Sequence, residues 1–526
     1  MKVKLKLLIV LVVLVLLVTA CSGQQADTPD KELPPNKVVQ EPSKGGKITI
    51  GIDLNNLIID PLGYQSTRPS FYNIHSILYR GLLKYDQDLE LIPDLASSFA
   101  IDEENKQIKI VLKDDLKWAD GTPLTIEDVE FTFNWYSQRD YNGNWKTYTF
   151  HILGTKLFRT GEAADVSGII IEPSERSITI QYDQIDSKDL QLLTAPILPK
   201  KQLLGKSIEQ VIEEASTGKL MASGPYKVEI KENEWILTRN DYYEETVYLD
   251  QIEITNYNND REFNFLLALP QDVGENLSSK KIHVLEGIGY QYLGMNLNSP
   301  KWKDIEMRKA LALAIDYSKI IDDIYQGYAD TPASVLHPKS WAFNSSIELK
   351  TNIEEAKAIL NGKEINVELA YVDTPMNQMI AEKLSEQLNV VGITISLNPL
   401  DLERFIPELF SKGKYDLFLA NWPYELDPSY ENDKWLTKND VLNGGFNVSH
   451  VNDTISDQLL IDGSKLWHYQ ERKEIYKKWQ DYFMSQYYLI PLASPQSIIL
   501  ADPTLHLEIK NSLTPYIFIN KWWIEK

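Results

Sequence analysis

The sequence has almost no cysteine: among its 526 residues the single example is Cys21. One thiol excludes intramolecular disulfide bonds, and we expect no thiol nucleophile from a cysteine so close to the N-terminus. Histidine is scarce too, with seven residues scattered singly, and no HExxH, GxSxG or P-loop motif occurs. We therefore expect no enzyme, although 75 acidic residues leave the carboxylate pair of a glycosidase open.

Positive charge is in short supply as well. The chain has 53 lysine and arginine residues against 75 aspartate and glutamate residues, a formal net charge of −22. Without Lys2, Lys4 and Lys6, which belong to the N-terminal leader, the net charge falls to −25. Such an acidic surface repels phosphate backbones, so we expect no nucleic-acid partner.

Long apolar runs are absent except at the N-terminus. There, residues 7–18 follow the basic start and form a run of 12 apolar residues, shorter than the roughly 20 needed to span a bilayer. Small residues then precede Cys21, as in the lipobox of bacterial lipoproteins, with Val18 in place of the usual leucine. We predict that residues 1–20 are a signal peptide and that Cys21 is acylated. The alternative is an ordinary secreted protein with a chance cysteine.

The segment after the leader is polar and rich in proline, glycine and charge. Residues 21–45 cannot bury enough apolar surface to fold, so we interpret them as a flexible tether. About 480 residues follow, more than one core usually supports, so we expect two or three domains. We thus expect a globular body that is lipid-anchored at the outer face of the cytoplasmic membrane, or that is periplasmic.

Apolar spacing in the N-terminal half predicts mostly strands. Residues 47–53 alternate apolar and polar side chains and predict a strand, and residues 74–86 have the spacing of a helix. Thr125, with Asp128 three residues later, predicts a helix start. Further strands are predicted at 106–115, 167–173 and 177–183, and as a pair within 221–243.

The pattern changes near residue 285 to an α/β type. Residues 364–372, 375–391 and 393–400 predict strand, helix and strand, a βαβ unit that implies a parallel sheet. Residues 415–422 predict another buried strand, so that 421–427 lie at the carboxyl edge of this sheet, where open α/β sheets bind ligands. We also predict a strand at 290–298 and helices at 304–321, 402–411 and 465–486.

Several motifs resemble those of the family 5 extracellular solute-binding proteins, the oligopeptide- and dipeptide-binding lipoproteins of bacterial ABC importers. "WADGTPLTIEDVEFTF" (118–133) is similar to a marker stretch of that family. Four other segments resemble family motifs in the same order along nearly the whole mature chain: "LYRGLLKYDQDLELIPDLASSF" (78–99), "SGPYKV" (223–228), "YLGMNLNSPKWKDIEMRKALALAID" (292–316) and "YDLFLANWPYELDP" (415–428).

The resemblance implies an α/β fold of the two-lobed periplasmic-binding-protein type with an extra subdomain, which closes on its ligand about two hinges. Residues 46–80, 185–284 and 490–526 would form lobe one, 81–184 its subdomain and 285–489 lobe two. It also implies a monomer without cofactor or metal that captures peptides between the lobes and delivers them to an ABC transporter permease. Two alternatives keep the fold: a non-peptide solute (metal chelate, haem, opine or sugar), or a sensor of peptide pheromones.

The resemblance also suggests ligand contacts after the strand at 415–422. Trp422 matches the tryptophan at the strand end of the family, and Glu425 occupies the position of an acidic residue that pairs with the α-ammonium of a peptide. Asp427 matches the aspartate of the family's Asp-Pro pair, with a loop one residue shorter. A carboxylate in a closed cleft needs a cation, which a free amino terminus supplies. The alternative is that Glu425 caps or solvates a loop.

Backbone contacts would come from the strand edge, because extended peptides add to exposed edges. We expect Asn421 and Trp422 to provide them, whereas Pro423 lacks an N–H. Opposite them we expect three residues after the first strand: Asp53, Leu54 and Asn55.

Two positions leave the ligand's C-terminal anchor open. Leu419 stands where some peptide binders have an arginine, and Asn377 where others have a histidine. Asn377 can hydrogen-bond but carries no charge. Tyr292, Trp118 and Asn296 are candidates for lining the cleft, with packing as the alternative for each.

Overall fold

The computed structural model describes residues 41–55, 57–64, 73–232, 234–257, 262–268, 279–412 and 415–526. The predicted signal peptide, the predicted acylation site Cys21 and nearly all of the predicted tether lie outside these residues. In the part of the chain that is described, no helix combines the length and the apolar character that crossing a membrane requires.

The larger sheet contains seven strands drawn from distant parts of the chain, in the order β12-β19-β11-β1-β10-β9-β8. The predicted strand at 47–53 is β1, which pairs in parallel with β10 and β11. Its Ile48, Ile50 and Ile52 are buried, as the alternation predicted. The bounds are β1 (Lys47–Ile52), β8 (Tyr226–Lys231), β9 (Glu234–Arg239), β10 (Gln251–Asn256), β11 (Phe265–Ala268), β12 (Lys281–Leu285) and β19 (Ser497–Ala501).

A four-stranded antiparallel sheet, in the order β4-β5-β7-β6, lies within residues 96–181. Helix α3 (Ile126–Tyr136) packs on it. Thr125 is the N-cap residue of this helix and forms the predicted capping box with Asp128. Trp118 Nε1 donates to Asp128 Oδ2 at 3.3 Å. The bounds are β4 (Ala96–Asp102), β5 (Gln107–Leu112), β6 (Ile169–Glu172) and β7 (Ser177–Gln181).

The prediction of a helix at 74–86 is wrong. The chain forms only one turn, α2 (His75–Leu78), and then strand β2 (Leu83–Tyr85), which pairs with β3 (Leu91–Pro93). Gly81 packs so closely on the backbone of Thr194 that an added Cβ would lie 2.6 Å from the Thr194 carbonyl. The apolar residues of this stretch are therefore buried on both sides of an extended chain rather than along one helical face.

The second large sheet contains six strands in the order β14-β18-β13-β17-β15-β16. The predicted βαβ unit is confirmed: β15 (Ile365–Val372) and β16 (Ile393–Leu400) pair in parallel over their full length, joined by α10 (Pro375–Asn389). The remaining bounds are β13 (Gly289–Met295), β14 (Ala329–Asp330), β17 (Leu417–Pro423), β18 (Leu489–Pro495), α9 (Ile353–Leu360) and α11 (Leu402–Lys412).

The helix predicted at 304–321 is two helices, α7 (Ile305–Leu313) and α8 (Tyr317–Tyr325). Asp316 separates them because its carboxylate accepts the backbone N–H of Lys319 at 3.2 Å, which starts a new helix.

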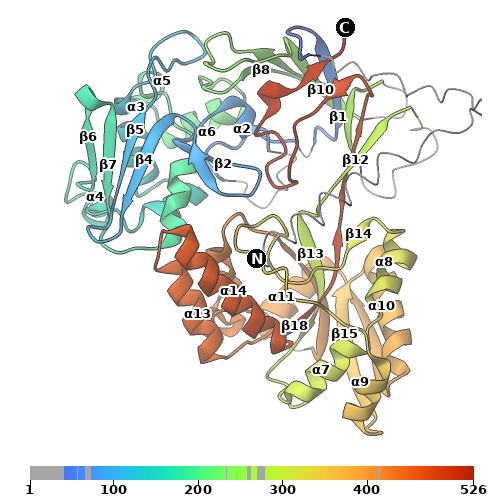
Figure 1. The fold of residues 1–526 in the computed structure, drawn as a ribbon. Helices are drawn as coiled ribbons and strands as arrows, with labels where there is room; N and C mark the ends of the chain where they lie inside the picture. The colour runs from blue at the N-terminus through green and yellow to red at the C-terminus, as the bar shows by residue number, and fades with distance from the viewer. Residues whose placement is uncertain are drawn as a thin grey trace, which may run out of the picture. The chain divides into compact units, whose positions relative to one another are not determined.

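The chain passes between the two large sheets twice, from β12 to β13 and from β18 to β19 (Figure 1). Because β18 pairs with β13, residues 489–495 extend the six-stranded sheet, and the return to the seven-stranded sheet falls at Gln496. This return lies six residues after the division that we expected between 489 and 490.

Shorter elements complete the described chain. They are α4 (Thr155–Thr160), α5 (Lys200–Leu203), α6 (Ile208–Ser216), α12 (Glu431–Trp435), α13 (Thr454–Ser464), β20 (Leu505–His506), β21 (Trp523–Ile524) and the 3-10 helices η2 (Asn144–Thr149), η3 (Pro173–Glu175), η4 (Ser187–Thr194), η7 (Pro428–Tyr430), η8 (Thr437–Asn439), η9 (Val441–Asn443) and η10 (Ile519–Lys521).

The helix predicted at 465–486 begins later, as α14 (Tyr469–Ser485), because the segment before it reaches the four-stranded sheet. Trp467 is fully buried against the ring of Tyr182, and its Nε1 donates to the Asp186 carbonyl at 3.1 Å. Its backbone N–H donates to Glu103 Oε1 at 2.6 Å. Trp467 therefore anchors the 465–468 segment to residues beside the four-stranded sheet.

We predict that Trp467→Ala lowers the free energy of unfolding by about 3–5 kcal/mol, since a large ring leaves the core. Trp467→Phe is the control: it keeps most of the packing, loses one hydrogen bond and should cost about 1 kcal/mol. Denaturant unfolding of both variants measures the difference. Equal, small losses would contradict the packing role.

Candidate functional site

A cavity of about 1580 Å³ is lined by residues from 73–194, from 288–430 and from 495–517, including strands of the six-stranded sheet. It exceeds the roughly 300–1,000 Å³ of usual small-molecule pockets, so it can hold a ligand of several residues. Its walls come from five regions: the β2–β3 hairpin, the start of η2, the start of β13, the residues that begin α10 and the end of β17. Residues 513–517, near the C-terminus, add a sixth region to these walls.

The end of β17 presents an unused backbone edge. Along one side β17 pairs with β13 up to Gly289↔Pro423. On the other side β15 pairs with it only at Leu417 and Phe418. Among the described strands, residues 419–423 thus have a partner along one edge only. Asn421, Trp422 and Pro423 line the cavity, as predicted for the carboxyl edge of this sheet.

Aromatic rings form much of the cavity wall. Tyr290 packs against Tyr424 at 5.3 Å between ring centroids, and the hydroxyl groups of Tyr148 and Tyr430 hydrogen-bond to each other. Since Tyr148 belongs to η2 and Tyr430 to η7, this bond joins segments nearly 300 residues apart in sequence. These rings offer flat apolar surface together with hydroxyl groups.

Glu425 lines the cavity, with its side chain 28% exposed, and it already has a cation beside it. Lys434 Nζ lies 3.2 Å from Glu425, 3.0 Å from Glu431 and 3.3 Å from the Pro423 carbonyl. Lys434 also lies over the Trp422 ring at 5.5 Å. Lys434 is a cation that the sequence argument did not consider, and two carboxyl groups share it.

Glu425, Glu431 and Lys434 form a charged trio, in which burial and neighbouring charges shift the pKa values of Glu431 and Lys434. Burial raises the pKa of Glu431, against the opposing effect of Lys434. Burial alone would lower the pKa of Lys434, but Glu431 and Glu425 outweigh it and raise that pKa. Lys434 therefore stays charged beside two carboxyl groups at the cavity wall.

Asp427 does not line the cavity. It is 2% exposed, and its Oδ1 lies 2.5 Å from Nη2 of the fully buried Arg472. The same oxygen accepts the Ser429 N–H at 2.9 Å and so caps η7. Its role in this structure is to hold the turn, which the Asp-Pro pair alone did not reveal.

Asn377 lines the cavity at the start of α10, with both ends of its amide engaged. Its Oδ1 accepts from Gln291 Nε2 at 2.8 Å, and its Nδ2 donates to the Val372 carbonyl at 2.9 Å. Tyr292, by contrast, is fully buried in the core and packs edge-on against Phe418. Tyr292 is therefore a packing residue of the core and does not line the cavity.

The other candidate ligand contacts do not line the cavity either. Leu54 N–H donates to Asn256 Oδ1 at 2.8 Å, and Asn55 N–H donates to Asp53 Oδ1 at 3.0 Å, so these residues form a turn after β1. Trp118 is buried on Asp128. Asn296 accepts the Asn298 N–H at 3.0 Å in the turn after β13.

Sequence reasoning missed several residues of the cavity wall. Lys84 and Tyr85 lie in the family-like segment 78–99, but no contact role was expected for them. Tyr148 lies in no motif, and only the tertiary structure brings the three residues to the cavity. Lys434 could have been suspected, because Glu431 stands three residues earlier at a helical spacing that pairs opposite charges.

Comparison with known proteins identifies the family. The family model of bacterial extracellular solute-binding proteins, family 5 (middle), matches residues 90–442. The chain belongs to this family. Its members bind solutes outside the cytoplasm and are not enzymes, and the fold is the α/β periplasmic-binding-protein type with more than one sheet.

Two similar proteins, AppA and NikZ, illustrate what this chain resembles. The oligopeptide-binding protein AppA of Bacillus subtilis is 23% identical, over 100% of this chain and 99% of its own. The structure of AppA from Bacillus subtilis with a nonapeptide matches with a TM-score of 0.67 at 21% identity, covering 92% of this chain and 100% of that one. NikZ from Campylobacter jejuni, in complex with Ni(L-His), matches with a TM-score of 0.65 at 20% identity, covering 91% and 99%.

Behind the cavity wall, His337 is a buried neutral base. It is fully buried, its ring lies edge-on to Tyr424 at 5.2 Å between centroids, and its Nδ1 accepts the Lys339 N–H at 3.0 Å. Burial lowers the pKa of His337 from 6.5 to about 4. The unfolded chain therefore binds a proton between these values that the folded protein does not.

We predict that the stabilising effect of neutral His337 is complete above pH 6.5 and is lost as the pH falls towards 4. Between pH 7 and 4.5 the loss from this group should be about 2–3 kcal/mol. In His337→Gln the acid-induced decrease in unfolding free energy should be smaller by that amount. Denaturant unfolding at both pH values is the measurement, and equal decreases in both proteins would contradict it.

Proposed function

We propose that this family 5 protein is a lipid-anchored receptor that captures peptides in its cavity and delivers them to an ABC transporter permease. The observation that carries the proposal is the unpaired edge of β17 at residues 419–423, beside the cavity-facing carboxylate of Glu425. A backbone edge binds an extended chain through groups that every peptide has, whatever its side chains.

The size of the cavity supports a ligand of several residues. At about 1580 Å³ it is larger than a single amino acid or a sugar requires. The relative AppA is named for oligopeptide binding and has been crystallised with a nonapeptide. Pro423 removes one N–H donor from the edge. Asn421 is then the proposed main-chain donor on this side, because strand alternation turns the N–H of Trp422 toward β13.

The charge of the Glu425 trio supports a cationic ligand group. Lys434 satisfies Glu431 and reaches Glu425, but one lysine cannot neutralise two carboxylates. Placing an ammonium group beside Glu425 restores balance in a partly desolvated wall. We therefore keep Glu425 as the proposed contact for a free amino terminus, with Lys434 orienting its carboxylate.

The neighbour NikZ has been crystallised in complex with Ni(L-His). In the described part of this chain, no group of three or more histidine, cysteine, aspartate or glutamate side chains is placed to hold a metal ion. The size of the cavity and the edge of β17 support a peptide over this alternative.

The remaining parts of the proposal concern organisation. We assign lobe one to the seven-stranded sheet, with residues 81–184 as its subdomain, and lobe two to the six-stranded sheet, with hinges at 286–288 and Gln496. We also propose that the protein acts as a monomer at the outer face of the membrane, held by acylated Cys21 and residues 22–45.

Substitution of Glu425 tests the proposed contact with the amino terminus. Glu425→Gln should weaken binding of free-amine peptides by about 10- to 100-fold, because a charge-assisted hydrogen bond is lost. N-acetylated peptides should change little. Calorimetry with matched peptide pairs measures this, with the exposed Glu403→Gln of α11 as a control that leaves both unchanged. Equal losses for both peptide forms would remove Glu425 from this role.

Ligand identity can be tested on the body comprising residues 46–526, purified without denaturation. Native mass spectrometry followed by acid release and tandem fragmentation should yield a ladder of peptides with free amino termini. A single non-peptide mass would overturn the peptide assignment while leaving the family unchanged.

Substitution of Cys21 tests the proposed lipid anchor. In a bacterial host that processes lipoproteins, the protein should incorporate radiolabelled palmitate and remain with the membrane fraction. Cys21→Ser should abolish the label and release the protein, because the acyl chains supply the membrane affinity. Label incorporation that persists in Cys21→Ser would contradict the proposed anchor.

A further inference from the structure

Lys84 places a second charged group at the cavity. It is the central residue of strand β2, lines the cavity and has a side chain that is only 15% exposed. Its Nζ lies 3.7 Å from Asp94 Oδ1 and 6.0 Å from the centre of the Phe518 ring. The distance to Asp94 is that of an ion pair but exceeds that of a hydrogen bond.

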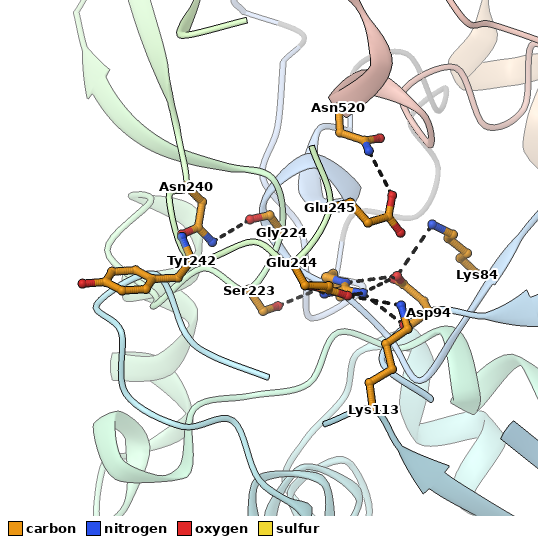
Figure 2. Close-up of polar contacts among 11 residues, drawn as sticks. Lys84, Asp94, Lys113, Ser223, Gly224, Asn240, Tyr242, Glu244, Glu245 and Asn520 are labelled. Atoms are coloured by element: carbon orange, nitrogen blue, oxygen red, sulfur yellow. Dashed lines mark hydrogen bonds and ion pairs between the residues drawn. The ribbon is translucent and has the colours of Figure 1, made fainter. Parts of the chain in front are cut away.

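Asp94 is already committed to another cation. Its Oδ1 accepts from Arg80 Nε at 3.0 Å and from Arg80 Nη2 at 2.8 Å. Figure 2 shows the contact between Lys84 and Asp94 at the edge of this cluster. Lys84 therefore approaches an Asp94 oxygen that already accepts hydrogen bonds from two nitrogens of Arg80.

The other carboxylates of the cluster also have partners. Glu244 accepts from Arg80 at 2.7 and 2.8 Å and from Lys113 at 3.2 Å. Glu245 accepts from Asn520 Nδ2 at 3.1 Å (Figure 2). Within the described residues of this cluster, no acceptor lies within hydrogen-bond distance of Lys84 Nζ. Its three N–H donors are thus available to a ligand.

We infer that Lys84 binds the carboxylate of the ligand. A largely buried ammonium group without a close acceptor is costly, and an incoming carboxylate at about 2.8 Å supplies a charge-assisted hydrogen bond. The inference rests on the proposed function and defines its substrate class: peptides with a free C-terminal carboxylate, rather than C-amidated or internal segments.

Lys84 and Glu425 would then act on opposite ends of one ligand. Lys84 belongs to the β2–β3 hairpin in the N-terminal half, whereas Glu425 follows β17 of the six-stranded sheet. An extended peptide separates its two end charges by about 3.3–3.6 Å per residue, so these two contacts set a preferred length. A ligand that reaches both also bridges the two halves of the protein.

The experiment measures the binding of synthetic alanine-rich peptides of three to nine residues, each as the free acid and as the C-terminal amide. The body comprising residues 46–526 should bind the best free acid at least about 10-fold more tightly than its amide. Lys84→Met should remove this preference by weakening the acids and leaving the amides within about twofold. Lys84→Arg should retain it, because the charge is kept.

Lys113→Met is the matched control, because Lys113 belongs to the same cluster but does not line the cavity. Its acid-to-amide ratio should equal that of the unsubstituted protein. Thermal melting verifies that each variant is folded, and the ratio in the unsubstituted protein decides the matter if Lys84→Met does not fold.

Two results would overturn the role of Lys84: equal affinities for acids and amides in the unsubstituted protein, or equal losses for both in Lys84→Met. Either would leave peptide binding intact. If the unsubstituted protein binds none of these peptides while its native mass spectrum shows a non-peptide ligand, the proposed function fails and the inference fails with it.

Discussion

The buried ion pair between Arg472 and Asp427 is the interaction on which the cavity wall depends. Both side chains are almost fully buried, so each needs the other to avoid an uncompensated charge. Arg472 also donates from Nε to the Gly463 carbonyl at 3.1 Å, which ties α14 to the end of α13. The pair thereby fixes the turn after β17 to the helical layer behind it and determines where Glu425, two residues earlier, emerges.

The charges at the cavity form two unequal groups. Near the end of β17, Lys434 serves two carboxyl groups. Near the β2–β3 hairpin, Asp94 is held by Arg80, and Lys84 lies beyond its hydrogen-bonding reach. Between these groups, aromatic rings and the unpaired edge of β17 present apolar surface and main-chain groups. Such a surface suits an extended ligand with an ammonium group at one end and a carboxylate at the other.

Local sequence signals succeeded where one interaction dominates. The capping box at Thr125 and the βαβ unit at 365–400 were predictable because capping and apolar alternation act over a few residues. The helix expected at 74–86 failed because its apolar spacing reflects burial on both faces of an extended segment, and Gly81 meets Thr194 across more than 100 residues. Trp467 fits a helical pattern but lies before α14, since its ring is buried against Tyr182.

The sequence by itself determined the family, the absence of disulfides, the acidic surface and the strand end at 421–425 as a candidate site. Each of these depends on composition or on contiguous motifs. Only the tertiary structure decided that Asp427 supports a turn, that Lys434 accompanies Glu425 and that Lys84 reaches the cavity. The physical reason is that charge compensation depends on distance in space: a carboxylate's partner can come from any segment that folding brings within about 4 Å, and sequence separation carries no record of it.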